Sequence, residues 1–358
     1  MKILMIGPLP KPITGLSLAN QIVLDYLPKY SNYKIDIVNT NYTVLKEDIG
    51  KFSFKKVLYY IKQYKALHKV QKADKVYMTV GQTFFGVLKY YPYFLMAKIY
   101  KKEIIVHIHG NHLWKEYEDL KGWKKRLFYK ILSMSDKGIV LSDSLKKNMI
   151  PFIPDDKIYV LENFVEDFLF ESEVHKKFEK LHIVFLSNLM QEKGIMDLLE
   201  SLLLLKKQGI DFEAQIAGGI DSSMKEKIDP YFAKLSENVK YLGLVYGDEK
   251  KKLLEWGNIF VFPTYYTMEG QPISIFEAMA TGNIILTTAH AGIPDVFENG
   301  INGFYVDKKS PSSITNKLIE LNEDLEKYKN ISDHNMQEAK EKYRVKHFIE
   351  KLAQILED

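Results

Sequence analysis

Two glutamates and a lysine have the side chains and neighbours needed to hold a charged, hydroxylated ligand. Glu269 and Glu277 enclose the segment Glu-Gly-Gln-Pro-Ile-Ser-Ile-Phe-Glu, and Lys193 stands just before a separate helical pattern. An ionised carboxylate accepts hydrogen bonds at several sites, which suits the hydroxyl groups of a sugar or a ribose. A lysine suits a diphosphate, because a leaving diphosphate gains negative charge in the transition state.

The first glutamate precedes a pattern that predicts the start of a helix. A strand expected at 259–262 and a loop at 263–268 lead to Glu269, Pro272 suits the first helical turn, and Gly282 suits the C-terminal cap. Ligands of open α/β folds bind at the carboxyl edge of the strands, and free N–H groups of a first helical turn bind anions. Because proline has no N–H, the expected donors are those of Gly270, Gln271, Ile273 and Ser274.

Both glutamates also have an ordinary interpretation. Glu269 can be a charge at a helix end, and Glu277 can be a surface side chain. The residues around Glu277 are apolar or small, so the helix is expected to be nearly buried, and buried helices rarely carry an idle carboxylate. Taken alone, the two glutamates leave both interpretations open.

The elements that must position these residues alternate between strand and helix in both halves of the chain. Strands are expected at 2–6, 34–38, 75–80, 103–109 and 138–141, and then at 181–186, 212–217, 239–242, 259–262, 284–287 and 304–306. A helix at 195–207, capped by Gly209, follows the first strand of the second half. This alternation predicts two Rossmann-like domains, each a parallel sheet with helices on both faces, and a cleft between them. A charged stretch at 166–180 predicts the division into 1–170 and 171–340.

The composition excludes some classes of site. The 358 residues include no cysteine, so disulfides and thiolate metal sites are excluded, and we find no convincing carboxylate–x–carboxylate metal box. The first apolar run, at 3–6, is too short for a signal peptide or a membrane span, so a cytoplasmic protein is expected. Basic residues outnumber acidic ones in 1–170. That excess indicates either an anionic partner or a solvated lysine-rich surface.

Several motifs together resemble retaining glycosyltransferase family four, the group 1 glycosyltransferases of polysaccharide assembly. The Glu-x7-Glu segment followed by Ala-Met-Ala-x-Gly resembles the signature of that family. Further segments resemble the family's other turns in the same order; they are 187–194, 216–219, 239–246, 288–295 and 299–303. The likeness covers most of 181–307 and is less specific in the first half.

The resemblance implies a GT-B fold, in which two Rossmann-like domains face each other across a cleft and a final helix within 341–358 crosses back to the first domain. It implies transfer of a hexosyl or N-acetylhexosaminyl group, with retention and without a metal or cofactor, from a nucleotide-diphosphate sugar. UDP-sugar is the expected donor. The expected acceptor is a glycan or a lipid-linked glycan of bacterial surface polysaccharide.

The resemblance also assigns roles to residues. Glu269 would hold hydroxyls of the transferred sugar, Glu277 the donor ribose and Lys193 the diphosphate, while His109, at the end of a strand, would lie near the donor sugar. The other donor-binding residues that it implies are Gly15, Asn188, Gly219, Tyr246, Gly270, Gln271, Pro272 and Ile273. Two of these residues keep structural alternatives: Gly15 can belong to a plain strand–helix turn, and Lys193 can be a solvated loop lysine. For His107, which shares a strand face with His109, we expect a core position.

One position departs from the family pattern. Asn188 stands where the family usually has an arginine, and an amide cannot replace a charged bidentate fork. We expect Lys193 and helix N–H groups to carry the diphosphate instead. Two other functions stay open: a non-catalytic glycosyltransferase-like partner subunit, which Asn188 favours, and a sugar-nucleotide epimerase on the same fold.

Residues 113–134 mix aromatic and basic side chains at helical spacing. Such a stretch can touch an anionic membrane surface, here at the inner face of the cell membrane, or it can be an amphipathic helix that covers its own sheet. Nucleic-acid binding is not expected, because no recognition motif accompanies the basic residues.

Overall fold

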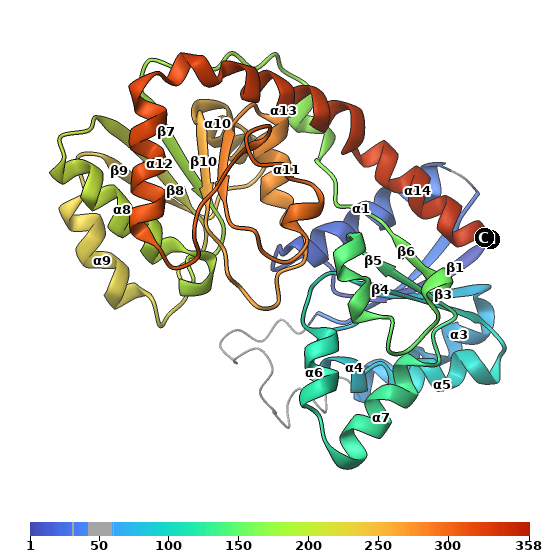
Figure 1. Cartoon of the computed structure of the whole chain (residues 1–358). Helices are drawn as coiled ribbons and strands as arrows, with labels where there is room; N and C mark the ends of the chain where they lie inside the picture. Colours follow the sequence, from blue (N-terminus) through green and yellow to red (C-terminus); the bar gives the residue numbers. More distant parts are fainter. Residues whose placement is uncertain (31, 42–58, 60) are drawn as a thin grey trace. The chain divides into compact units, whose positions relative to one another are not determined.

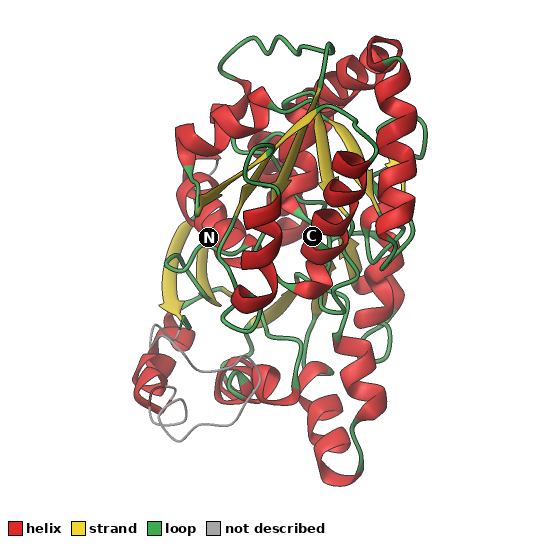
Figure 2. Ribbon diagram, turned by 90° about the vertical axis from the view of Figure 1, so that its left-hand side faces the viewer, coloured by secondary structure: helices red, strands yellow, loops and turns green. Residues whose placement is uncertain are grey.

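The structure, a computed structural model, describes residues 1–30, 32–41, 59 and 61–358. The chain forms two compact units. The first consists of Met1–Asn163, Met268–Gln271 and Lys346–Asp358, and the second consists of Phe164–Thr267 and Pro272–Val345. In each unit the strands lie inside a layer of helices (Figures 1 and 2).

The first unit has a six-stranded parallel sheet with the order β2-β1-β3-β4-β5-β6. Its strands are β1 Lys2–Gly7, β2 Lys34–Asn39, β3 Lys75–Met78, β4 Glu103–Ile108, β5 Lys137–Val140 and β6 Ile158–Val160. Its helices are α1 Gly15–Tyr30, α3 His68–Lys72, α4 Phe84–Leu88, α5 Tyr91–Ile99, α6 Leu113–Asp119 and α7 Gly122–Leu132.

The second unit repeats this plan with the strand order β12-β11-β10-β7-β8-β9, again all parallel. Its strands are β7 Leu181–Leu186, β8 Phe212–Ala217, β9 Val239–Gly243, β10 Ile259–Phe262, β11 Ile284–Thr287 and β12 Gly303–Tyr305. Its helices are α8 Ile195–Lys207, α9 Lys225–Lys234, α10 Gly247–Trp256, α11 Ile273–Ala280, α12 Pro311–Glu323 and α13 Lys329–Lys342.

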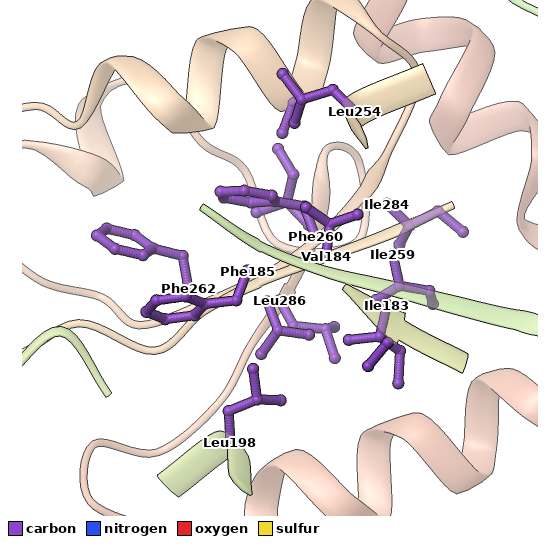
Figure 3. Close-up of a cluster of buried hydrophobic side chains, with 14 of the residues drawn as sticks. Ile183, Val184, Phe185, Leu198, Leu254, Ile259, Phe260, Phe262, Ile284 and Leu286 are labelled. Atoms are coloured by element: carbon purple, nitrogen blue, oxygen red, sulfur yellow. The ribbon is translucent and has the colours of Figure 1, made fainter. Parts of the chain in front are cut away.

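The core of the second unit explains why its central strands β7, β10 and β11 are mostly apolar. Leu198 of α8 and Leu254 of α10 lie on opposite sides of the strands (Figure 3), and Ile183, Val184 and Phe185 of β7 are all fully buried. Side chains on both sheet faces therefore leave water, which is the usual situation for a parallel sheet. The edge strand β9 and its neighbour β8 differ, because they carry exposed polar side chains such as Lys240 and Glu213.

The last helix, α14 (Val345–Glu357), has most of its residues in the first unit. The ammonium group of Lys137 donates a hydrogen bond to the carbonyl of Ile355 over 3.0 Å, and that of Lys75 donates to the carbonyl of Leu356. Cations at these positions compensate the free carbonyls and the negative end of the helix dipole. Glu103 pairs with both lysines and so orients them toward the helix end.

The expected α/β class and the strand–helix alternation are confirmed, and three details differ from the sequence-based expectation. Strand β6 was not predicted, because it has only 3 residues and stands between charged segments. Helix α11 begins at Ile273, so Pro272 occupies the N-cap position and not the first turn. The units divide between Asn163 and Phe164, and Met268–Gln271 packs with the first unit.

The turn after β8 generates a stability prediction. Gly218 has φ +140°, and a Cβ there would lie 1.8 Å from the carbonyl oxygen of Ser187. We expect Gly218→Ala to lower the free energy of unfolding by at least about 3 kcal/mol, because the ends of β7 and β8 must separate. Urea unfolding monitored by circular dichroism measures it.

Gly209 provides the matched control for this substitution. It also has a positive φ, +72°, but nothing lies within 4 Å of the added Cβ. Gly209→Ala should therefore cost only the backbone strain, about 1 to 2 kcal/mol. Equal losses for the two variants would show that the close approach to Ser187 does not constrain the turn.

Candidate functional site

The residues expected in the site are distributed over both units. Those in the first unit are Gly15, His109, Glu269, Gly270 and Gln271. Those in the second unit are Asn188, Lys193, Gly219, Tyr246, Pro272, Ile273 and Glu277. The contacts within each unit show how its own group of residues is held.

In the first unit, the segment Met268–Gln271 is fastened at the carboxyl edge of the sheet. The backbone N–H of Asn163 donates to Oε1 of Gln271 over 2.8 Å, and the Asn163 side chain donates to the Gln271 carbonyl over 2.6 Å. Gln82, in the loop after β3, donates to the carbonyl of Met268 over 3.3 Å. Glu269 is thereby fixed between two anchors and is only 8% exposed.

Gly270 brings this segment against the end of β4. A Cβ at Gly270 would lie 2.8 Å from the carbonyl oxygen of His109 and 3.0 Å from Cα of Gly110. Only a glycine allows this approach without displacing the backbone. The structure therefore brings Glu269, Gly270 and His109, three of the residues expected in the site, to one place at the sheet edge.

His109 is paired with the second histidine of its strand. The rings of His107 and His109 lie 3.9 Å apart at their centroids, and the Tyr77 hydroxyl is 2.6 Å from Nδ1 of His107. Burial raises the pKa of Tyr77, so the phenol keeps its proton and donates it in this hydrogen bond. His107 is fully buried, as its position predicted.

Both imidazoles stay neutral at ordinary pH. Burial lowers the pKa of His109 to about 3. Burial, and then the neighbouring His109, lower the pKa of His107 well below its ordinary value. A neutral His109 can exchange a hydrogen bond with a sugar hydroxyl but cannot supply a positive charge.

The loop before α1 is also held firmly. Thr14 and Ser17 form reciprocal bonds, with the Ser17 N–H donating to Oγ1 of Thr14 over 3.1 Å and the Thr14 N–H to Oγ of Ser17 over 2.8 Å. Asn20 donates to the carbonyl of Pro8 over 2.8 Å and to Oγ1 of Thr79 over 2.9 Å. Gly15 is thus the first residue of a helix whose N-terminal loop is tied to the end of β3.

In the second unit, Lys193 lies over two aromatic rings. Its Nζ is 4.8 Å from the ring centroid of Tyr266 and 5.4 Å from that of Phe262. The next residue, Gly194, has φ +83°, and a Cβ there would lie 2.5 Å from the Pro263 ring. This close turn, which the sequence pattern did not reveal, brings the lysine to the carboxyl end of β10 and favours a cation held by cation–π contacts.

Asn188 and Gly219 lie side by side at the ends of β7 and β8. The Asn188 side-chain oxygen would be 3.6 Å from a Cβ at Gly219, and the Leu189 N–H donates to the Gly219 carbonyl over 2.8 Å. Tyr246 occupies the N-cap of α10, after β9, and is exposed. All three residues thus lie beyond the carboxyl ends of their strands.

Glu277 has a partner that the sequence analysis missed. Its Oε1 is 2.5 Å from Nζ of Lys250, and the same Nζ is 2.9 Å from Oε2 of Glu166. Glu277 itself is only 4% exposed, so its helix is buried as predicted. A signal for Lys250 was present: Leu253 and Leu254, three and four positions along α10, are buried and place Lys250 on the inward face.

Two further findings bear on the kind of site. Among the residues that the structure describes, no group of three His, Cys, Asp or Glu side chains is placed to hold a metal ion. Within the same part of the chain, no helix is long and apolar enough to span a bilayer.

With this geometry in view, comparison with known proteins shows which proteins the chain resembles. Residues 167–342, slightly less than half of the chain, match the family described as glycosyl transferases group 1. The amylovoran biosynthesis glycosyltransferase AmsK of Erwinia amylovora is 28% identical over 175 residues, which are 48% of this chain and 43% of AmsK.

A second relative, the capsular polysaccharide biosynthesis glycosyltransferase CapM of Staphylococcus aureus, is 26% identical over 222 residues, which are 57% of this chain and 58% of CapM. Both alignments thus span less than two thirds of the relative.

A solved structure extends the likeness to the whole chain. The crystal structure of Anabaena Alr3699/HepE in complex with UDP and glucose matches with a TM-score of 0.73, at 15% identity, over 100% of both chains. At this identity the match shows the fold, and it confirms the expected α/β class with two Rossmann-like units of the GT-B type.

The buried histidines generate a prediction about pH. His109 accepts a proton near pH 6.5 in the unfolded chain but only near pH 3 in the folded chain. Between these values the unfolded chain binds more protons, so stability is full above about pH 6.5 and falls as the pH drops toward 3. We expect His109→Asn to remove about 1 to 2 kcal/mol of the stability lost between pH 7 and pH 5.

Urea unfolding at the two pH values measures this difference. His175 provides the control, because its side chain is 80% exposed and His175→Asn should leave the pH dependence unchanged. An unaltered pH dependence in His109→Asn would show that the folded chain protonates this imidazole freely.

Proposed function

We propose that the chain is a retaining glycosyltransferase that transfers a hexosyl or N-acetylhexosaminyl group from a UDP-sugar to a glycan or lipid-linked acceptor in the assembly of bacterial surface polysaccharide. One observation carries the proposal most directly. Residues 167–342 match glycosyl transferases group 1, and this segment contains Lys193, just before α8, and the buried Glu277, within α11, whose side chains suit the diphosphate and the ribose of a nucleotide. The likeness to a UDP-bound structure and the name of CapM support the donor and the pathway.

The proposed reaction assigns one task to each group. The bond between the sugar C1 and the diphosphate oxygen breaks, and a bond from C1 to the acceptor oxygen forms on the same face, while the acceptor proton passes to the leaving phosphate. Lys193 and the N–H groups at the start of α11 stabilise the diphosphate as its charge grows. Glu269 accepts hydrogen bonds from the sugar hydroxyls, and the neutral His109 contacts the same sugar.

Asn188 limits what the second unit can contribute. An exposed amide stands where the family's arginine is expected, so we propose that Lys193 and the α11 terminus supply the positive charge that the diphosphate requires without a metal ion. The same residue favours the second candidate function, a non-catalytic subunit that binds or regulates an active partner.

The function is tested by product analysis. Thermal-shift screening against UDP-, GDP- and ADP-sugars first identifies the donor, and the isolated chain is then incubated with that donor alone and with lipid-linked glycan acceptors. Transfer or slow donor hydrolysis supports the glycosyltransferase. Binding without turnover supports the non-catalytic subunit, and interconversion of the donor sugar without acceptor supports an epimerase.

Two substitutions test the proposed roles. Glu269→Gln and Lys193→Ala should each lower kcat by at least about a hundredfold, because each removes a partner of the transition state. Steady-state transfer assays measure the effect, with thermal melting to show that the fold persists. Lys207→Ala, at the exposed end of α8, is the control and should keep the wild-type rate. Wild-type rates in both variants would remove these residues from the mechanism.

The lipid-linked acceptor is supported by a surface of the first unit, which we call the α4–α7 patch. Phe85 of α4 is 45% exposed, and Trp123 and Tyr129 of α7 are 65% and 45% exposed. Nζ of Lys124 lies 5.9 Å from the Trp123 ring and 6.0 Å from the Phe85 ring. Aromatic side chains between cations are characteristic of surfaces that insert into the headgroup region of an anionic membrane.

The buried face of α7 fits the interpretation of this stretch as an amphipathic helix that covers its own domain. Phe128, Ile131 and Leu132 of α7 are buried against the first unit, so the helix does cover its own domain. Trp123 and Tyr129 are largely exposed among basic residues, although Trp123 also contacts the buried Phe84 and Tyr129 contacts the buried Phe152. We propose that this exposed face contacts the inner face of the cell membrane.

Vesicle co-sedimentation tests the patch. The chain should bind vesicles of phosphatidylglycerol and phosphatidylcholine but not vesicles of phosphatidylcholine alone, because both apolar insertion and charge contribute. Phe85→Ser with Trp123→Ser should weaken binding by about tenfold or more. Tyr30→Ser, which removes an aromatic residue that is 48% exposed in α1, should not. Equal binding to neutral and anionic vesicles, or none to either, would contradict the proposal.

A further inference from the structure

The structure assigns a positioning role to Lys250, which no motif singled out. We propose that Lys250, held by Glu166, fixes the Glu277 carboxylate in the orientation that accepts the hydroxyl groups of a ribose, so that Lys250 contributes to nucleotide affinity without touching the nucleotide. This inference rests on the proposed function, because it takes the ligand of Glu277 to be a nucleoside diphosphate.

The geometry supports a fixed arrangement of the three side chains. Nζ of Lys250 lies 2.5 Å from Oε1 of Glu277 and 2.9 Å from Oε2 of Glu166. It also lies 5.3 Å from the centroid of the Phe168 ring. The side chains of Lys250 and Glu277 are 12% and 5% exposed. Two carboxylates and an aromatic ring therefore confine the ammonium group from three directions.

Electrostatics keep Lys250 charged in this setting. Burial acts to lower the pKa of Lys250, but the attraction of Glu277 and Glu166 outweighs it and the pKa of Lys250 is raised. The cluster holds two carboxylates and one ammonium, so it keeps a net negative charge. A hydroxyl donor is the kind of neutral ligand that such a carboxylate can still accept.

A gain in folding stability does not by itself account for the cluster of Lys250, Glu277 and Glu166. Glu277 stands in a helix whose neighbours Phe276 and Ala278 are fully buried, and taking an ion pair out of water costs about as much as the attraction returns. Apolar residues of similar volume would serve the packing as well. Lys250 engages Oε1 and so restrains the carboxylate, which leaves Oε2 as the acceptor for a ligand.

The inference has a specific thermodynamic signature. If Lys250 acts through the contact between Glu277 and the ribose, its removal should weaken binding only of ligands that carry the 2′ and 3′ hydroxyls. If Lys250 merely supports the fold of α10 and α11, its removal should weaken every nucleotide equally. Comparison of a nucleotide with its dideoxy analogue separates these two roles.

The experiment measures dissociation constants by calorimetry for the full chain with UDP, GDP and ADP, each beside its 2′,3′-dideoxy analogue. In Lys250→Met, the affinity for the ribonucleotide that the wild type binds should fall by about tenfold or more, since a hydrogen bond to a charged group is lost or misdirected. The affinity for the dideoxy analogue should change less than about twofold. Lys250→Arg keeps the charge and should restore most of the difference.

Two further variants keep the test decisive. Lys250→Gln repeats the measurement if Lys250→Met melts below the assay temperature. Glu277→Ala removes the carboxylate, and adding Lys250→Met to it should cause no further loss of ribonucleotide affinity. Equal loss for both ligands, no loss for either, or a further loss in the double variant would overturn the inference while leaving the proposed function intact. A wild type that binds none of the three nucleotides would overturn both.

Discussion

The burial of the central strands on both faces of each sheet is the constraint on which the rest of this molecule depends. Strands such as β1, β10 and β11 are buried along almost their whole length, because helices cover both faces of a parallel sheet, and they carry no charged side chain between their ends. Many polar side chains lie in the loops beyond the carboxyl ends of the strands. Because the strands are parallel, these loops lie along the same edge of the sheet. Glu269 and His109 in one unit, and Lys193 and Asn188 in the other, occupy such loops.

Glycine makes these edges compact enough to bring the groups together. Gly270 lets the Met268–Gln271 segment lie against the backbone of β4, and Gly218 lets the end of β8 meet the end of β7. In both places a single methyl group would collide with a main-chain atom. The candidate site therefore depends on these glycines, which have no side chain, as much as on the charged groups that the glycines allow to approach.

The candidate site residues of the two units differ in charge. The first unit offers a neutral histidine and a nearly buried glutamate, whereas the second offers a lysine over aromatic rings and a carboxylate whose charge is partly compensated by Lys250. Each group of residues therefore belongs to its own unit, with a neutral hydrogen-bonding group in the first and a cationic one in the second.

The sequence predicted the class of fold and almost all of the strands, because long apolar runs alternate with amphipathic helices and short turns interrupt them. It also predicted that the helix of Glu277 is buried, as the structure shows, whereas the roles of Glu269, Glu277 and Lys193 in a site stay predictions. It did not predict the pairing of Gln271 with Asn163, or that of Lys250 with Glu277, since each joins residues that are far apart in the chain and brought together only by packing. Sequence spacing reveals which face a residue occupies, but not what lies opposite that face.

The end of α14 has a consequence for how the chain folds during synthesis. Residues 346–358 complete the first unit, where Lys75, Lys137 and Tyr33 bind the last turn of the helix. Domains generally fold in the order in which they emerge from the ribosome. Here the unit that emerges first cannot be completed until the whole of the second unit has been translated, so the bonds of Lys75, Lys137 and Tyr33 to α14 form only after its neighbour has been made.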